Sequence, residues 1–469
     1  MIIRGLKSGT AIAAILAIVT APTFAQDDQG GLRIQLGVQQ GFGYGDNLAL
    51  GVPGSVTNPE EGSSALSTSS FALQLESITR TQEFRLQTGG SLRYGHLPEG
   101  STQSTGFVDP FVSLYYKREG AASRFTFDAR LSETSISQAA PLWEFSDEDG
   151  LIAPPADLGQ LTGTGTRQGY AVRTELETGI DSPIGFRLGL RAEGADYEDA
   201  TSTSLTPYDR YTVTGSTYFR FNEITSAVLD LRYSHYSNDS GDPDRETKTA
   251  EVGFDRDLAS GGTLSARIGY TQTDQGDLLL GSEADGVTGR LGYSQPLLNG
   301  SLGATYGRTR DSDGEIDNVM LSRRLELPLG RVDVRLGATS LYGASPELVG
   351  GLGYNGSTRT GGYSVRLDRT VTSDSNDENR FTTLFSAQYS QDLTAYSSFV
   401  ASLSYYQLDE TSLENGVEQT NLRLGYQYEL TQDWSLNSGI SLRSRDEDNV
   451  GKADSQEVYL NIARKFDLN

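Results

Sequence analysis

Residues 264–270 of the chain read Leu-Ser-Ala-Arg-Ile-Gly-Tyr. Apolar side chains occupy every second position from Leu264 to Tyr270, and serine, arginine and glycine stand between them. This period of two predicts a β-strand with one apolar face and one polar face. The pattern continues for about ten residues per segment, which is the length of a strand that crosses a membrane. The same alternation recurs in both directions along the chain, at 125–131, 332–338 and 422–428.

The connections between these segments are of two kinds. Short turns are flanked by aromatic residues and leucine, whereas several of the other connections are longer and acidic, as at Asp446-Glu447-Asp448. Short turns at one end and long loops at the other are typical of a transmembrane barrel. The sequence therefore predicts an all-β fold, a transmembrane antiparallel up-and-down β-barrel of about 22 strands, with 18 to 22 acceptable. We place short turns near 81, 120, 183, 222, 260, 298, 329, 357, 394 and 432, a first strand at 31–44 and a last strand at 456–468.

The beginning of the chain has the order of a secretory signal peptide. Arg4 and Lys7 precede an apolar stretch, and small residues end at Ala25, so we expect residues 1–25 to be removed and 26–469 to form one barrel domain without a separate plug domain. Removing two basic residues and no acid changes the formal net charge from −24 to −26, which makes nucleic acid an unsuitable partner. The chain has no cysteine, so it can use neither disulfides nor thiolate chemistry.

The last strand carries the resemblance to a known class. Val458, Leu460, Ile462 and Phe466 share one register, and this arrangement resembles the terminal strand of porin-like β-barrels in the outer membrane of Gram-negative bacteria. Arg464 interrupts the register, and three residues follow the final aromatic one, where the family usually ends on it. The resemblance implies outer-membrane lipid and lipopolysaccharide as partners, and it allows a homo-oligomer.

Arginines recur along the polar face of the predicted strands. In contact with lipid such a row would be very costly, so we expect it to line the lumen. The arginines are then either fixed charges that set ion selectivity or members of structural pairs with carboxylates. The predicted lumen arginines are Arg93, Arg130, Arg173, Arg187, Arg191, Arg220, Arg232, Arg267, Arg290, Arg335, Arg366, Arg423 and Arg443.

The longest predicted loop spans residues 133–166. Its stretch Trp143-Glu144-Phe145-Ser146-Asp147 resembles the inward-folded third loop of general porins, although the paired glycines of that family are missing. The resemblance implies a constriction formed by Glu144, Asp147, Glu148 and Asp149 opposite the arginines. A solvated outer loop is the alternative.

His235-Tyr236-Ser237-Asn238 resembles the signature of outer-membrane phospholipase A and lipid A deacylase. A hairpin centred near Gly241 would place Glu246 opposite Ser237, and a base, a nucleophile and a carboxylate would then meet on the lipid-facing side. Lys248 would fall opposite His235, which does not fit a triad. An interfacial belt of Tyr and His is the other interpretation.

No stretch predicts a bound cofactor or metal. Asp311, Asp313, Glu315 and Asp317 alternate as in a solvated acidic loop, and the glycines at 351, 353 and 356 lack the βαβ unit of a nucleotide site. The sequence therefore favours a channel for passive diffusion of small hydrophilic solutes or ions, which is not an enzyme. The alternatives are export of a polysaccharide or another secreted product, and third an outer-leaflet lipid hydrolase that uses His235, Ser237 and Glu246.

Overall fold

The computed structural model describes residues 31–468 except 56–61, 99–104, 137–154, 162, 203–204, 240–243, 276–284, 312–313, 375 and 413. A single ring of 22 strands contains almost all regular structure in these residues. The strands are β1 Leu32–Asp46, β2 Ser63–Ile78, β3 Gln82–His96, β4 Gly106–Glu119, β5 Ser123–Ser135, β6 Thr166–Thr178, β7 Ile184–Glu198, β8 Tyr208–Asn222, β9 Thr225–Asn238, β10 Arg245–Asp257, β11 Thr263–Gln275, β12 Gly286–Leu297, β13 Gly300–Arg310, β14 Glu315–Leu327, β15 Gly330–Leu341, β16 Glu347–Thr358, β17 Gly361–Ser373, β18 Asn379–Thr394, β19 Ser397–Leu408, β20 Val417–Glu429, β21 Trp434–Glu447 and β22 Gly451–Asp467.

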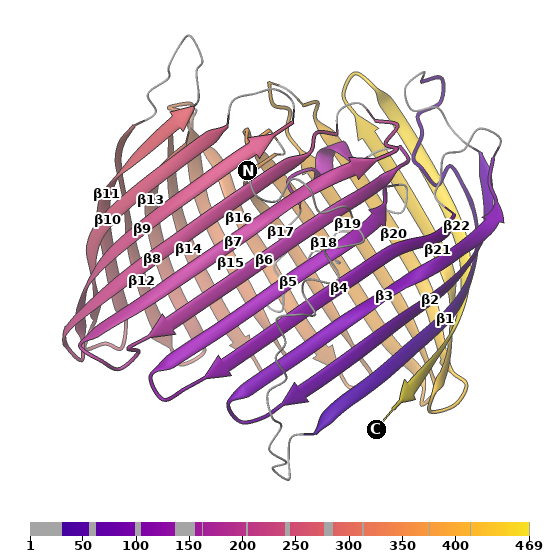
Figure 1. The fold of residues 1–469 in the computed structure, drawn as a ribbon, viewed down its shortest axis with the longest axis horizontal. Helices are drawn as coiled ribbons and strands as arrows, with labels where there is room; N and C mark the ends of the chain where they lie inside the picture. The colour runs from indigo at the N-terminus through magenta and orange to yellow at the C-terminus, as the bar shows by residue number, and fades with distance from the viewer. Residues whose placement is uncertain are drawn as a thin grey trace.

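Each strand pairs antiparallel with the next one along the chain, and β22 pairs with β1 to close the barrel. Across the closing seam Gln39 lies opposite Ala463 and Phe42 lies opposite Leu460. Figure 1 shows the strands tilted to the barrel axis, with β2 to β9 in front and β14 to β19 behind. The predicted fold class and the prediction of 22 strands are confirmed.

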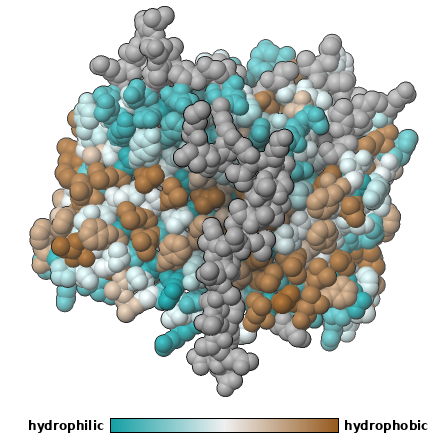
Figure 2. All heavy atoms as spheres, viewed as in Figure 1, coloured by the Kyte–Doolittle hydropathy of each residue, from teal (hydrophilic) through white to brown (hydrophobic). Residues whose placement is uncertain are grey.

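The barrel has apolar side chains on its outer surface and polar side chains on its inner face, the reverse of a soluble protein. Ile268, Leu336 and Val458 on the outer face are 62%, 56% and 60% exposed, whereas Thr382 and Ser404 on the inner face have no exposed surface. Figure 2 shows hydrophobic residues gathered in a band, with hydrophilic residues above it at the end that carries the long loops. A contiguous apolar outer band of this kind is the surface that a bilayer covers.

The turns follow from local sequence. At the β10–β11 turn Gly261 has a φ of +82°, a conformation that glycine adopts without strain. The glycine-rich stretch 348–356 lies within strand β16 and pairs with β15 and β17. The only helix in the described ranges is the 3-10 turn η3, Leu158–Gln160, and none there is long and apolar enough to cross a bilayer.

Candidate functional site

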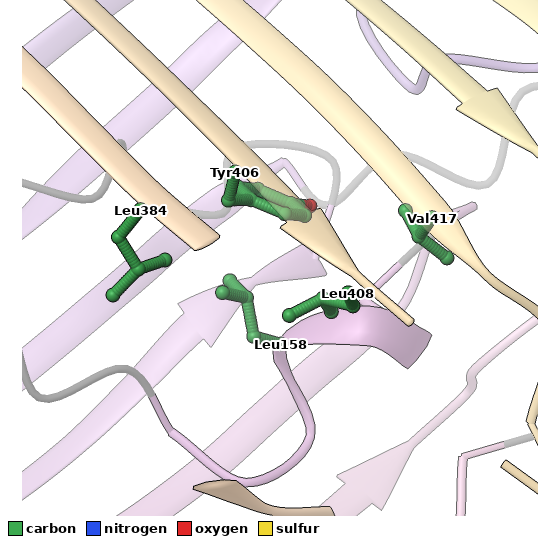
Figure 3. Packing of buried hydrophobic residues seen from close by; sticks show 5 residues of the cluster. All are labelled: Leu158, Leu384, Tyr406, Leu408 and Val417. Atoms are coloured by element: carbon green, nitrogen blue, oxygen red, sulfur yellow. The ribbon is translucent and has the colours of Figure 1, made fainter. Parts of the chain in front are cut away.

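A segment of the β5–β6 loop crosses the interior of the barrel. Leu158 in η3 packs against Leu384, Tyr406, Leu408 and Val417 (Figure 3). These four residues belong to β18, β19 and β20, which lie on the opposite side of the ring from β5 and β6. The segment 155–161 is therefore a bridge between two distant walls, and we call it the crossing segment.

One ion pair and a tyrosine hydrogen bond fix the crossing segment at its near wall. Asp157 has no exposed surface, and it accepts hydrogen bonds from Arg167 Nε at 2.5 Å and from a terminal guanidinium nitrogen of Arg167 at 3.0 Å. The hydroxyl of Tyr197 donates to the same carboxylate at 2.5 Å. Arg167 and Tyr197 come from β6 and β7, so the base of the segment is held by the strands next to it.

Other polar contacts hold the crossing segment at the far wall. Gln160 Nε2 donates to Glu414 Oε1 at 2.6 Å, and Arg445 donates to the carbonyl oxygen of Gly159 at 2.6 Å. Glu414 also pairs with Arg380 at 2.8 Å, and the two side chains are 7% and 2% exposed. Breaking one partner of such a buried pair is strongly destabilising, because a charge is left without compensation.

The β17–β18 loop makes a second bridge in the opposite direction. A guanidinium nitrogen of Arg210 on β8 lies 2.5 Å from Asp377 Oδ1, and Arg245 on β10 donates to the carbonyl oxygens of Asn376 and Asp377 at 3.2 Å. Asn376 Nδ2 reaches Glu414 at 3.2 Å, which joins this loop to the contacts of the crossing segment. We call the crossing segment together with residues 374, 376–378, 411–412 and 414–416 the loop cluster.

Asp374 is the most unusual ionisable group of the loop cluster. Its side chain has no exposed surface and accepts hydrogen bonds from the backbone N–H groups of Asn376 and Glu378 at 2.8 and 2.9 Å. Burial, followed by the nearby negative charge of Glu414, raises the pKa of Asp374 from 3.8 to about 7. The carboxyl group therefore changes charge near neutral pH while it holds its loop in place.

The thirteen arginines that were predicted to line the lumen all lie within strands of the barrel. Most of them have partners. Carboxylates pair with Arg93, Arg173, Arg187, Arg191, Arg267, Arg290, Arg335 and Arg366. Arg220 and Arg443 donate to backbone carbonyl oxygens, and Arg423 lies over the ring of Tyr459. Within the described ranges, Arg130 and Arg232 make no ion pair.

The predicted constriction residues Glu144, Asp147, Glu148 and Asp149 lie outside the described residues. So does the predicted signal peptide, residues 1–25. The residues of the loop cluster were not predicted from the sequence. The sequence gives only a small signal for the loop cluster, because Ala156 and Leu158 are apolar residues in an otherwise acidic loop.

The predicted hydrolase triad is wrong in its register. Glu246 lies opposite His235 and not opposite Ser237, and Lys248 lies opposite Tyr233. The His235 ring stacks on Tyr211, with 6.4 Å between the ring centroids. In the described part of the chain no hydrogen bond joins Ser237 to His235, so the nucleophile would have no base.

Of the alternating acidic residues, Asp313 lies outside the described residues, and Asp311, Glu315 and Asp317 have partners within the protein. Asp317 accepts two hydrogen bonds from Arg308, at 2.8 and 2.7 Å, and Glu315 pairs with Arg310 at 3.0 Å. Among the described residues no group of three or more acidic or histidine side chains could hold a metal ion.

No protein-family model and no curated protein matches the sequence. Solved structures match over nearly the whole chain. A variant of the ferric enterobactin receptor PfeA from Pseudomonas aeruginosa, in complex with enterobactin, matches at a TM-score of 0.51 and 10% identity, covering 94% of this chain and 82% of the receptor. The FrpB iron transporter from Neisseria meningitidis matches at a TM-score of 0.51 and 8% identity, covering 92% and 81%. The chain has the fold of a Gram-negative outer-membrane β-barrel protein.

These findings correct the predicted function. Two of the solved barrels that match are a receptor and a transporter, not passive channels, so the expectation of passive diffusion through a porin-like pore is wrong. The two alternative functions are not those of the matched proteins either. Export of a polysaccharide differs from the role of a receptor for enterobactin. The lipid hydrolase differs from it as well, and its predicted triad is not formed.

Proposed function

We propose that the barrel is a gated receptor that takes up a small solute across the outer membrane, with the loop cluster as its closure. The observation that carries the proposal is the crossing segment, which is fixed to the near wall through Asp157 and to the far wall through Leu158 and Gln160. The receptor and transporter nature of the structurally similar barrels supports it. In this proposal the barrel has no catalytic role.

The chemistry of the closure suits a gate. Its far contacts combine one apolar cluster with hydrogen bonds and an ion pair, and a bound solute can replace polar contacts with its own. A ligand shifts such an equilibrium only as far as it binds the open state more tightly than the closed one. We therefore expect transport to depend on ligand binding and not on pore diameter alone.

We also propose how the chain reaches the outer membrane and what it contacts there. Residues 1–25 direct export and are cleaved after Ala25, and outer-membrane lipid and lipopolysaccharide contact the apolar band (Figure 2). Copies of the chain can also contact one another through this band and form a homo-oligomer.

Swelling of proteoliposomes in arabinose tests the closure. We expect the wild-type chain to admit arabinose at no more than a tenth of the rate of a variant in which residues 155–161 are replaced by a Gly-Ser linker of equal length. Leu298→Asp, in the fully exposed β12–β13 turn, is the control and should behave as the wild type. Equal swelling of the wild type and the linker variant would overturn the proposal.

A further inference from the structure

Four arginines lie on the outer face of the barrel, at the end that carries the short turns. They share the parity of the exposed apolar side chains on their strands, so they point away from the lumen. Arg256, for example, has the parity of Phe254, and Arg323 has that of Leu321. We call these four residues the arginine ring: Arg118 on β4, Arg256 on β10, Arg323 on β14 and Arg464 on β22.

No carboxylate accompanies the arginine ring on the outer face of the strands. In the short-turn half of the described strands every aspartate and glutamate has the inward parity, as Asp255 has. At the loop end the outer face also carries acids. There Lys248 Nζ lies 2.9 Å from Glu246 Oε2, and Lys452 Nζ lies 3.7 Å from Asp454 Oδ1. Bases on the outer face are thus paired with acids at the loop end and stand alone at the short-turn end.

The arginine ring has no counterion within the protein. Among the described residues Arg118 and Arg256 make neither an ion pair nor a hydrogen bond, and both are exposed. Arg323 donates to Asn299 Oδ1 at 2.7 Å and to the carbonyl oxygen of Ser301 at 3.1 Å, which are neutral acceptors. The positive charge of the ring therefore acts on whatever surrounds the barrel.

Arg464 is the most constrained member of the ring, because it lies over two aromatic rings. Its guanidinium carbon is 5.3 Å from the centroid of the Trp434 ring and 4.3 Å from that of Phe466. Trp434 is directly opposite Arg464 in the register of β21 and β22, and Phe466 follows two positions later, so all three share the outer face. Such stacking orients the guanidinium and leaves its terminal N–H groups for an anion. We call these three residues the aromatic site.

We infer that the aromatic site binds the phosphate group of an anionic phospholipid in the periplasmic leaflet of the outer membrane. Short turns of such barrels lie on the periplasmic side, and interfacial tryptophan lies at the level of the headgroups. The C-terminal end of β22 lies at the short-turn end, which places the aromatic site at this level (Figure 1). The guanidinium fork matches two phosphate oxygens with parallel hydrogen bonds.

The absence of acids selects the class of lipid. A zwitterionic headgroup brings an ammonium group as well as a phosphate, and the outer face of the strands at this end offers it no carboxylate. An anionic headgroup has no such group to pair. The inference rests on the proposed contact of the barrel with outer-membrane lipid, and it adds the lipid class and the site; it does not depend on the gate.

Quenching of Trp434 fluorescence in liposomes tests the inference. The chain has two tryptophans, so Trp143→Phe leaves Trp434 as the only one. This parent protein is reconstituted in phosphatidylcholine liposomes with a small fraction of a lipid that carries a quencher near its headgroup, either phosphatidylglycerol or phosphatidylcholine. We expect the quenching to report about five-fold tighter binding of phosphatidylglycerol, since one arginine attracts an anionic lipid surface to about this extent. Equal quenching by the two labelled lipids would overturn the inference and leave the lipid contact intact, whereas no quenching by either would overturn both.

Two substitutions in this parent locate the binding. Arg464→Gln should make the two labelled lipids quench equally. Lys452→Gln is the matched control, because Lys452 lies on the outer face of the same strand at the loop end, and it should keep the difference. A difference that survives Arg464→Gln, or that disappears in the control, would overturn the inference. The comparison of the two lipids on the parent protein decides it even if Arg464→Gln fails to fold.

Discussion

At the scale of single residues, the loop cluster depends on carboxyl groups that are held away from water. Asp374 accepts hydrogen bonds from the backbone N–H groups of its own loop and from the hydroxyl of Thr411 at 3.3 Å. The charges of Glu414 and Arg380 act on it in opposite directions, Glu414 raising and Arg380 lowering its pKa. Since burial raises the pKa of Asp374 to about 7, the folded loop prefers the protonated form. The stability of the loop is then greatest below the ordinary pKa and is lost as the pH rises through 7.

Asp374→Asn should remove this pH dependence. Asparagine keeps the acceptor for the two N–H groups but has no charge to acquire. We expect the hydrogen-exchange protection factors of the amides of Asn376 and Glu378 to fall several-fold from pH 5 to pH 8 in the wild type and to stay constant in the variant. Amides in the middle of β18 provide the internal control. Identical profiles in the two proteins would show that Asp374 does not control the loop.

The residues that could be predicted from sequence are those fixed by alternation. The grouping of the predicted arginines on one face of their strands follows from the period of two, because parity alone assigns a side chain to one face of a strand. Their partners do not follow from it, and neither does the register across a long loop. The predicted pairing of Ser237 with Glu246 was wrong by two positions, since His235 is the residue opposite Glu246. An even error keeps every side chain on its face but changes every partner.

At the scale of elements, turns could be predicted and inward loops could not. The structure has a short connection within two residues of each of the ten predicted turn positions, because turn residues and the break in alternation are local signals. The loop cluster depends on contacts between distant residues, such as Gly159 with Arg445 and Arg210 with Asp377. No periodicity within the loop 133–166 encodes such contacts.

The buried ion pair of Arg380 with Glu414 should stabilise the loop cluster. Arg380→Gln and Glu414→Gln each leave a buried charge without its partner, which costs about 3 to 5 kcal/mol for such a pair. We expect proteinase K to cut the loop cluster at least ten-fold faster in either single variant. The double variant should be cut more slowly than both, because no unpaired charge remains. Additive effects of the two substitutions would show that the pair does not act as a unit.

At the scale of the whole molecule, the first and last strands must meet, since an open edge strand in a membrane would leave unpaired backbone groups. The seam pairs β1 with β22 from Gln35 opposite Asp467 to Asp46 opposite Gln456. A side-chain contact reinforces it at the loop end, where Asn47 Nδ2 donates to the carbonyl oxygen of Asp454 at 3.0 Å. The ring is thus closed by residues from the two ends of the chain.

Paired cysteines can test this closure, because the chain has none of its own. Gln39 and Ala463 lie directly opposite each other on one face, so Gln39→Cys with Ala463→Cys should form a disulfide on mild oxidation. Gln39→Cys with Asn461→Cys is the control, since Asn461 lies opposite Gly41 and such diagonal neighbours are about 7 to 8 Å apart, beyond normal disulfide reach. The oxidised first pair joins nearly the whole chain into a covalent ring. After heating in detergent it should therefore migrate differently from its reduced form, and the control pair should not. If both pairs cross-link equally, or the first pair does not, the register of the seam is not the one that closes this barrel.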